Sequence, residues 1–245
     1  MPPERDVTGP QRLAVLVDAD QGQQGVIEEL LTEISRYGTA TIKRAYGDWT
    51  TPNLQGWKDV VHRVAMQPVQ QFRYTVGKNA TDSALIIDAM DILHAGLVDG
   101  FCLVSSDSDF TRLATRIREA GMVVYGFGER KTPKAFVAAC DKFVYLEILK
   151  DAPEEKTLEA AALPALKSMV VPALLAVGRE DGWASLSALG SQLTKNHPSF
   201  DPRMYKCAKL NDLVRKQPYL ELKEVTGGDG GTIHHFVRLR DSAAA

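Results

Sequence analysis

The sequence predicts an α/β protein in which a mainly parallel sheet flanked by helices is followed by a small winged-helix α+β domain. Three observations lead to this prediction. Short apolar runs alternate with helical patterns through the first part of the chain, as they do in repeated βα units. A polar, proline-containing segment at 151–163 then interrupts the alternation. Beyond it come three short helical patterns and two β-rich runs.

The strands of the first domain are predicted from apolar runs that are rich in β-branched residues. Runs of four or five such residues are typical of parallel strands that are buried on both faces. The predicted strands or extended pieces are residues 13–17, 39–46, 66–72, 101–104, 122–127 and 142–148.

Helical spacing of apolar residues separates these runs. Ile27, Leu30 and Ile34 form one such stripe, and Gly38 ends that helix. The predicted helices are residues 25–37 and 54–65, a helix that begins at 81–83, and residues 110–120 and 133–140.

The second domain has the layout of a winged helix-turn-helix. Two β-rich runs, 219–225 and 232–239, flank a glycine-rich loop at 226–231 and therefore predict a hairpin. The three helical patterns that precede it are residues 166–177, 185–193 and 204–215. We predict domains at 10–150 and 164–240, joined by a linker at 151–163.

Composition indicates a soluble cytoplasmic protein. The 245 residues are 44% hydrophobic and 24% charged, which is ordinary for a globular protein. Three widely spaced cysteines suit a reducing compartment and argue against a zinc site or a disulfide framework. The first residues lack the apolar core of a signal peptide. The apolar stretch 169–177 falls far short of a membrane span of about 20 residues.

The net charge of −2 conceals a difference between the two parts of the chain. Residues 160–245 carry 11 Lys and Arg against 8 Asp and Glu, whereas residues 1–159 carry 18 against 23. This difference is compatible with a metal site beside a nucleic-acid-binding module, and equally with chance variation between two domains.

Acidic residues follow two of the predicted strands directly. Asp18 and Asp20 come after the first strand, and Asp107 and Asp109 come after the strand at 101–104. The carboxyl ends of parallel strands meet at one edge of the sheet, where ligands bind. Carboxylates gathered there repel one another unless a cation neutralises them, and Mg²⁺ or Mn²⁺ prefers such oxygen ligands. Helix capping is the structural alternative for the Ser and Asp residues at 105–109.

A third acidic position, Asp82, lies at the start of a predicted helix and suits the same site if the helix N-terminus points at the crevice. Asp88 lies six positions later in this helix, about 600° of rotation away, so the two aspartates do not share a face. Asp88 and Asp20 are therefore secondary candidates. Four cations near these acids are candidates for contact with a phosphate substrate: Lys43, Arg44, Lys78 and Arg112.

Five segments of the first domain, in this order, resemble the NYN domain of the LabA-like family, which has a PIN-like nuclease fold. They are residues 17–20, 43–49, 78–91, 104–110 and 126–129. The resemblance covers about residues 10–150 and implies metal-dependent nuclease activity. It implies that the catalytic and metal-binding residues are Asp18, Asp82, Asp107 and Asp109. The family commonly has Asn shortly after the first acids, whereas this chain has Gln21 after Asp20.

The second domain resembles the OST-HTH (LOTUS) domain over about residues 164–240. The matching segments are residues 181–183, 186–190, 200–203 and 209–213. That family is associated with RNA binding, and some members bind a protein partner instead. Many members have Gly and an aromatic residue where this chain has Lys206-Cys207 after Tyr205. We expect Trp183 and Trp57 to lie in the core of their domains.

Together these observations predict a ribonuclease that hydrolyses RNA phosphodiester bonds, endonucleolytically, with Mg²⁺ or Mn²⁺ as cofactor and RNA bound by the second domain. Two alternatives stay open. An RNA-binding adaptor with an inactive site would bind without cleaving. A HAD-type phosphohydrolase would use Asp18 as a nucleophile, but the Thr or Val expected after the second Asp is missing.

Overall fold

The structure of the chain, a computed structural model, describes residues 9–72, 80–150, 165–226 and 233–240. It divides into two compact units, unit 1 at residues 1–151 and unit 2 at 152–245. The predicted linker, most of the glycine-rich loop and Lys78 lie outside the described residues, so the exact domain boundaries stay a prediction. Among the described residues, no helix has both the length and the apolar character that crossing a membrane requires.

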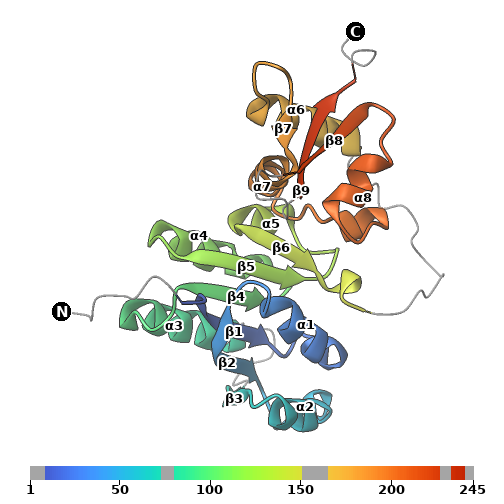
Figure 1. Cartoon of the computed structure of the whole chain (residues 1–245). Coiled ribbons are helices and arrows are strands. Elements are labelled where there is room, and N and C mark those ends of the chain that lie inside the picture. The colour runs from blue at the N-terminus through green and yellow to red at the C-terminus, as the bar shows by residue number, and fades with distance from the viewer. Residues whose placement is uncertain (1–8, 73–79, 151–164, 227–232, 241–245) are drawn as a thin grey trace. The chain divides into compact units, whose positions relative to one another are not determined.

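Unit 1 contains a six-stranded sheet in which every neighbouring pair of strands is parallel (Figure 1). The order across the sheet is β3-β2-β1-β4-β5-β6. The strands are β1 (Arg12–Asp18), β2 (Thr39–Gly47), β3 (Gln67–Gln70), β4 (Gly100–Val104), β5 (Val123–Gly128) and β6 (Lys142–Tyr145). The predicted α/β class with a mainly parallel sheet is confirmed.

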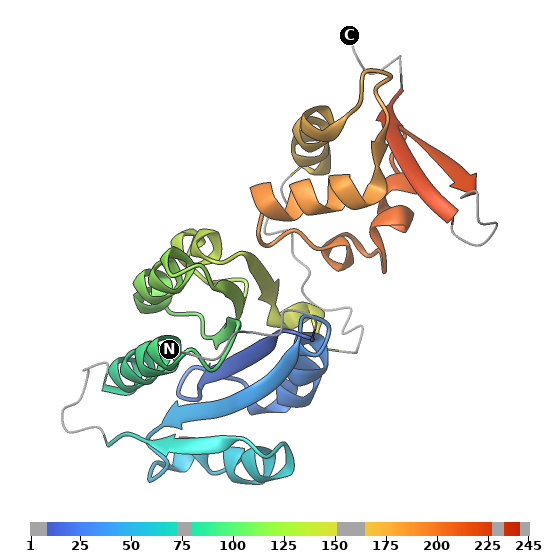
Figure 2. The ribbon, with the colours of Figure 1, turned by 60° about the vertical axis from the view of Figure 1, so that its left-hand side comes forward.

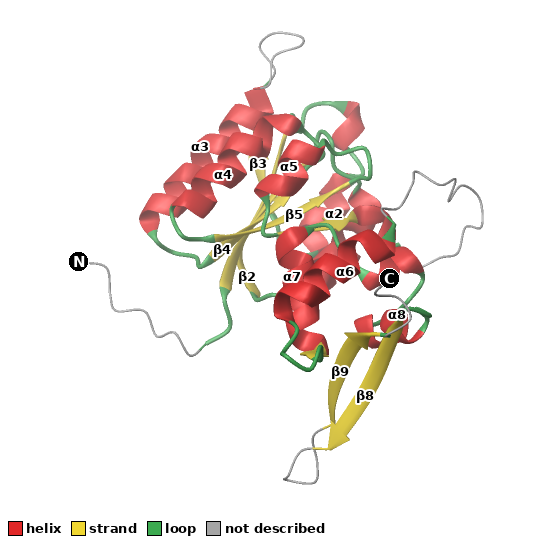
Figure 3. Ribbon diagram, turned by 90° about the horizontal axis from the view of Figure 1, so that it is seen from above, coloured by secondary structure: helices red, strands yellow, loops and turns green. Residues whose placement is uncertain are grey.

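Helices cover both faces of this sheet (Figure 3). They are α1 (Ile27–Ile34), α2 (Trp57–Arg63), α3 (Ala80–Ala95), α4 (Thr111–Glu119) and α5 (Lys134–Ala139). Successive side chains of a strand point to opposite faces, so β1 contributes to two cores. Leu13, Val15 and Val17 pack with α1 and α2. Ala14 and Leu16 pack with α3, α4 and α5. Burial on both faces explains why the strand is an unbroken apolar run.

The strand order reverses between β1 and β4. From β1 the chain builds outward through β2 to β3, then returns to β4 on the other side of β1 and builds outward to β6. Crossovers that leave in opposite directions open a crevice at the carboxyl ends of the two central strands. In this chain those ends are Asp18 and Val104.

In its described residues, unit 2 contains three α-helices and a three-stranded antiparallel sheet of order β7-β9-β8 (Figure 2). The helices are α6 (Leu166–Val177), α7 (Leu186–Asn196) and α8 (Leu210–Arg215). The strands are β7 (Ala184–Ser185), β8 (Leu220–Thr226) and β9 (Ile233–Leu239). One core joins residues of all three helices to Ala184, Leu220 and Val237 of the sheet. The predicted helices and hairpin are present, and β7 is an addition.

Two predicted elements become 3₁₀ turns over part of their predicted length. The last strand of unit 1 stops at Tyr145 and continues as a 3₁₀ turn, Leu146–Ile148. The predicted helix at 204–215 is a 3₁₀ turn, Pro202–Tyr205, followed by α8. Lys206 ends the 3₁₀ turn. Its φ of 57° lies in the left-handed region, and a right-handed helix cannot continue through such a residue. The other 3₁₀ turns among the described residues are Gln24–Val26, Pro52–Leu54 and Ser108–Phe110.

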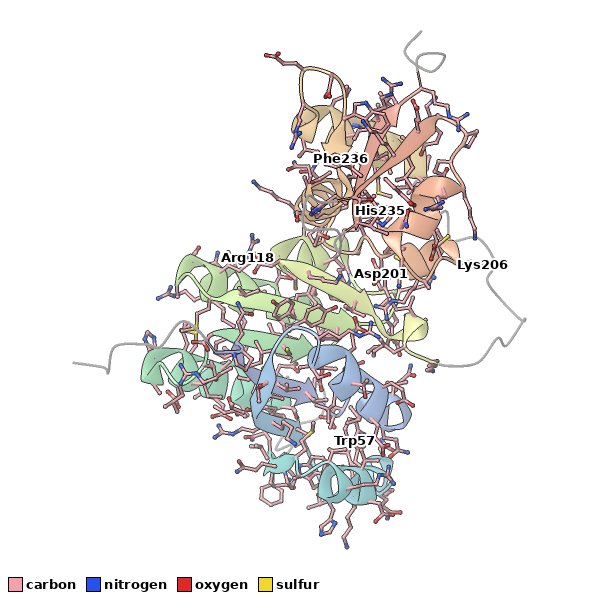
Figure 4. The ribbon with its side chains drawn as sticks, in the orientation of Figure 1. Trp57, Arg118, Asp201, Lys206, His235 and Phe236 are labelled. Atoms are coloured by element: carbon pink, nitrogen blue, oxygen red, sulfur yellow. The ribbon has the colours of Figure 1, made fainter. Side chains whose placement is uncertain are left out.

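The two tryptophans that were expected in the cores differ. Trp57 of α2 is 2% exposed and packs in the core of unit 1, as predicted (Figure 4). Trp183 is only half-buried and is not part of the core of unit 2, so that prediction is wrong. It precedes Ala184, which points into the core, and alternation therefore turns Trp183 to the outer face of the sheet.

Candidate functional site

The carboxyl ends of β1 and β4 bring Asp18 and Ser105 together at the crevice. Asp18 is the last residue of β1 and is 1% exposed. Ser105, which directly follows β4, donates a hydrogen bond from its Oγ to Asp18 Oδ2 at 3.0 Å. The backbone N–H of Gln21 donates to the other carboxylate oxygen at 3.3 Å. Asp18 is thus held in place from both sides.

The environment of Asp18 raises its pKa from 3.8 to about 7. Burial is the largest cause, because it disfavours the charged form. The nearby carboxylate of Asp82 raises the pKa further, and Asp20 adds a smaller effect. The hydrogen bonds from Ser105 and Gln21 act in the opposite direction, since they stabilise the carboxylate. Repulsion from Asp82 indicates that acids distant in sequence meet here.

Asp82, Asp107 and Asp109 form an acidic triad beside Asp18. One carboxylate oxygen from each of the three lies within 4.8 Å of the others. Asp82 comes from the first turn of α3, and the other two come from the segment between β4 and α4. Asp82 and Asp107 are half-buried and Asp109 is exposed, so the triad is open to solvent.

The capping alternative accounts for only part of this cluster. Asp107 Oδ1 accepts a hydrogen bond from the backbone N–H of Asp109 at 2.9 Å and caps the 3₁₀ turn Ser108–Phe110. That contact satisfies one donor and does not require Asp82 or the carboxylate of Asp109 to be nearby. Three oxygens at this spacing match what a divalent cation binds, and such oxygen ligands suit Mg²⁺ and Mn²⁺.

The comparison with protein families matches residues 12–147 to the NYN domain, which is more than half of the chain. The chain belongs to the NYN domain family. Residues 161–231 match the OST-HTH/LOTUS domain. Both predicted resemblances are confirmed. A nuclease-type domain and an RNA-binding type of domain in one chain support a nuclease or RNA-binding function.

Solved structures also resemble parts of the chain. A protein of unknown function from Vibrio parahaemolyticus is 20% identical over 58% of this chain and 96% of its own, with a TM-score of 0.49. A solution structure from Chromobacterium violaceum is 42% identical over 32% of this chain and 84% of its own, with a TM-score of 0.28. One from Nitrosomonas europaea is 28% identical over 37% and 87%, with a TM-score of 0.30. No curated protein matches the chain.

Two hydroxyl groups of the NYN domain support the acids, and the sequence analysis did not assign them a role. Ser105 Oγ accepts a hydrogen bond from the backbone N–H of Asp107 at 3.1 Å while it donates to Asp18. Thr81 Oγ1 donates to Asp20 Oδ2 at 2.9 Å. Both side chains are 5% exposed. Their signal in the sequence is a hydroxyl residue next to, or two positions before, a candidate acid.

A second polar group lies at the end of β5, in the Gly-Phe-Gly-Glu segment of the NYN domain. Gln23 Nε2 donates to Glu129 Oε1 at 2.5 Å, and Lys131 Nζ lies 2.7 Å from the other carboxylate oxygen of Glu129. The hydrogen bond from Lys131 is the main reason that the pKa of Glu129 lies below its usual value. Ser106 Oγ accepts the backbone N–H of Glu129 at 2.9 Å, which ties this group to the strand end that bears Ser105.

The surroundings of Gly128, the last residue of β5, leave no room for a side chain. A Cβ at this position would lie 2.6 Å from the carbonyl oxygen of Ser105 and 2.7 Å from Thr132 Oγ1. Distances under 3.0 Å are not tolerated, so any side chain would push the ends of β4 and β5 apart. The glycine therefore sets the close approach of the two strands beside the acids.

Asp88 and two of the predicted phosphate-binding cations make contacts within the fold. Asp88 accepts hydrogen bonds from Arg44 and from the Tyr46 hydroxyl, both on β2. It lies outside the acidic triad, as the helical spacing from Asp82 predicted. Lys43 Nζ donates to the carbonyl oxygen of Val64 at 2.6 Å. The substrate-binding role of Lys43 and Arg44 stays a prediction.

Of the other two predicted cations, Arg112 and Lys78, the structure describes only Arg112. Arg112 is exposed in the first turn of α4, three residues after Asp109. Lys78 lies outside the described residues. Arg112 is therefore the described cation whose position favours contact with a substrate at the triad.

Proposed function

We propose that the chain is a metal-dependent ribonuclease in which the NYN domain hydrolyses RNA phosphodiester bonds and unit 2 binds RNA. The observation that carries this proposal is the convergence of four aspartates at the strand-order reversal. Asp18 comes from β1, Asp82 from α3, and Asp107 and Asp109 from the segment after β4. Helix capping and core packing do not explain why four carboxylates gather at one crevice.

The donor set fits a divalent cation. Asp82, Asp107 and Asp109 offer carboxylate oxygens within 4.8 Å of one another, and we propose that they hold Mg²⁺ or Mn²⁺. Burial is the main reason that the pKa of Asp18 is raised, and repulsion from Asp82 adds to it; a cation would relieve this repulsion. When bound, such an ion would activate water and stabilise charge on the phosphate and the leaving oxygen.

The residues of the chain would divide the remaining tasks. Asp18, fixed by Ser105 and Gln21, would add a fourth carboxylate beside the open triad. Arg112, which is exposed and three residues after Asp109 in the sequence, would contact the substrate phosphate and stabilise its growing negative charge. We propose the same role for Lys78. Unit 2 would hold RNA near the site in the same chain, consistent with the OST-HTH/LOTUS match.

A cleavage assay on the purified full chain tests this function. Labelled single-stranded RNA, structured RNA and DNA are incubated with Mn²⁺, with Mg²⁺ or with a chelator, and products are resolved by electrophoresis. We expect RNA products only with metal. A circular RNA substrate would be cut as well, since the predicted activity is endonucleolytic.

The matched variants are Asp18→Asn with Asp107→Asn, and Asp91→Asn as the control. Asp91 is an exposed acid on α3, the helix that carries Asp82, but it is not part of the triad. The double variant should lose cleavage with an unchanged or raised Tm, and the control should cut as wild type does. Equal cleavage by the double variant in Mn²⁺ would refute the proposal. RNA binding by wild type without products under any condition would favour the adaptor alternative.

A further inference from the structure

The sheet of unit 2 has an inner face that packs on the helices and an outer face of different composition. Alternate residues of β8 and β9 enter the core, among them Leu220, Leu222 and Val237. The residues between them point to the outer face. There the antiparallel register pairs Lys223 with Phe236.

Trp183 and Phe236 are the two aromatic side chains on this outer face, and neither belongs to the core of unit 2. Trp183 directly precedes β7, and Ser185 of β7 pairs with Phe236 of β9. Both rings are half-buried, so part of each is accessible. Figure 4 marks Phe236 on β9. Aromatic side chains that gather on a solvent-facing sheet surface are typical of a binding site.

Three cations contact these rings. The guanidinium of Arg238 lies 4.7 Å from the centre of the Trp183 ring, and Lys223 Nζ lies 5.7 Å from it. The guanidinium of Arg179 lies 5.6 Å from the centre of the Phe236 ring. Arg179 and Lys223 are exposed, while Arg238 is half-buried and forms an ion pair with Glu221 at 2.8 Å. The outer face therefore alternates aromatic rings with positive charge.

Three acidic groups, Glu221, Asp181 and Glu180, lie near this surface beside its three cations. Glu221 is paired with Arg238. Asp181 and Glu180 lie in the loop before Trp183, and Asp181 Oδ1 accepts the backbone N–H of Trp183 at 3.1 Å. Asp181 thus acts as a turn residue that fixes the position of Trp183. Arg179, at the Phe236 ring, and Lys223, at the Trp183 ring, are both exposed, and neither takes part in an ion pair among the described residues.

We propose that this outer face, made of Trp183, Phe236, Arg179, Lys223 and Arg238, is a stacking surface for unpaired RNA bases. This inference rests on the proposed RNA binding by unit 2 and names the surface that would bind the RNA. Bases would stack on the two rings and on the planar guanidinium of Arg238, and Arg179 and Lys223 would contact phosphates. Aromatic and guanidinium planes bind splayed bases in this way in single-stranded RNA recognition.

The chemistry favours unpaired RNA over the two other occupants. The bases of an RNA duplex are stacked on one another, so their faces cannot reach a ring on a flat sheet. A protein partner would be expected to meet a contiguous apolar centre. Here charged side chains contact both rings. Among the described residues of this face, Val225 is the one exposed large aliphatic side chain, at 38%.

RNA binding by the full chain, measured by fluorescence anisotropy in a chelator to prevent cleavage, tests the proposal. The probes are a labelled single-stranded RNA without self-complementarity and an RNA duplex. Trp183→Leu and Phe236→Leu should each weaken binding to the single strand about 10-fold, since one stacked base is lost. Neither should change binding to the duplex.

A second variant, Arg179→Gln with Lys223→Gln, tests the phosphate contacts and alters only exposed side chains. The slope of log affinity against log salt should fall in magnitude by about 1.4, because each phosphate contact with a single strand contributes ~0.7. The matched control is Lys209→Gln with Lys216→Gln, two exposed cations at the ends of α8. It should leave affinity and slope unchanged. Circular dichroism checks that every variant is folded.

The outcomes separate this inference from the proposed function. If the α8 control loses affinity while the outer-face variants bind as wild type, the stacking surface is refuted and RNA binding by unit 2 stands. If wild type binds neither probe, both fail. Equal losses for the single strand and the duplex in the outer-face variants would also refute base stacking.

Discussion

At the scale of single residues, the environment of Asp18 disfavours its ionised form on balance. Its pKa is about 7 in the folded chain, against 3.8 for an ordinary Asp, because of burial and then of Asp82. Between these two pH values the folded state keeps a proton that the unfolded state releases. The free energy of unfolding of the metal-free protein should therefore fall as pH rises from about 4 to about 7.

Replacing Asp18 with Asn should remove this penalty while preserving the shape of the side chain. In a chelator at about pH 8, we expect Asp18→Asn to raise the free energy of unfolding by about 1–3 kcal/mol. At about pH 4 the gain should vanish, because the wild-type carboxyl is then protonated. Urea unfolding at the two pH values measures both differences. A gain of the same size at both would show that ionisation of Asp18 is not its cause.

Two aspartates of the same helix, Asp82 and Asp88, should respond to substitution in opposite ways. Asp88 binds Arg44 and Tyr46 of β2 and so anchors α3 to the sheet. Asp88→Asn should lower the free energy of unfolding by about 1–3 kcal/mol, since hydrogen bonds to a charged group are lost. Cleavage at saturating Mn²⁺ should stay within a few-fold of wild type.

Asp82→Asn should show the reverse, because Asp82 is part of the triad and is repelled by its neighbours. We expect no loss of stability in the metal-free protein and no cleavage. Thermal unfolding and the cleavage assay on both variants make the comparison. If Asp88→Asn abolished cleavage without destabilising the chain, Asp88 would belong to the site after all.

At the scale of elements, the segment between β1 and α1 positions Asp18 through a close approach of the backbone to α2. A Cβ on Gly22 would lie 2.8 Å from the carbonyl oxygen of Asp18 and 2.9 Å from Trp57 Cζ2. Gly25, three residues later, has nothing within 4 Å of its added Cβ. The two glycines therefore form a matched pair with different surroundings.

Gly22→Ala should displace this segment or Trp57, with a loss of about 1–3 kcal/mol in the free energy of unfolding and slower cleavage. Gly25→Ala should change stability by less than about 0.5 kcal/mol and leave cleavage as in wild type. Thermal unfolding and cleavage rates of both variants are compared. Similar behaviour of the two would contradict the close approach at Gly22.

The elements that could be predicted from the sequence are those whose signals are local. An apolar run for each central strand, and a terminal glycine such as Gly38 for a helix, are read directly from the residues, and the central strands agree with this prediction. β7 could not be predicted, because two residues become a strand only by pairing with Phe236 and Val237. The helix predicted at 204–215 is too long, because the left-handed residue Lys206 interrupts it without changing the spacing of the apolar residues.

The same distinction holds for the candidate site. Asp18, Asp107 and Asp109 follow strands whose carboxyl ends meet at one edge of a parallel sheet, so their approach follows from topology alone. Asp82 begins a helix, and its approach depends on where the N-terminus of that helix points. The roles of Ser105 and Thr81 depend on which side chain a hydroxyl faces, which no spacing reveals. Trp183 was assigned to the core because hydrophobicity does not distinguish the two faces of a short strand.

At the scale of the whole molecule, the chain joins an acidic unit, which we propose cleaves RNA, to a more basic one, which we propose binds it. Unit 2, residues 152–245, carries 12 Lys and Arg against 11 Asp and Glu, and unit 1, residues 1–151, carries 17 against 20. An acidic site by itself repels RNA, so affinity from a linked unit would raise the effective concentration of substrate. Binding and chemistry should therefore separate in kinetic measurements.

This separation is a prediction about two sets of variants in the full chain. Asp107→Asn should abolish turnover of single-stranded RNA while its Kd stays within about threefold of wild type, because the triad contributes to chemistry and not to affinity. Arg179→Gln with Lys223→Gln should raise KM about 10-fold with kcat unchanged, since uniform binding is lost. Steady-state cleavage in Mn²⁺ and anisotropy in a chelator give these values. A lower kcat with unchanged KM in the second variant would mean that unit 2 acts on the chemical step, and the division of roles between the two units would have to be abandoned.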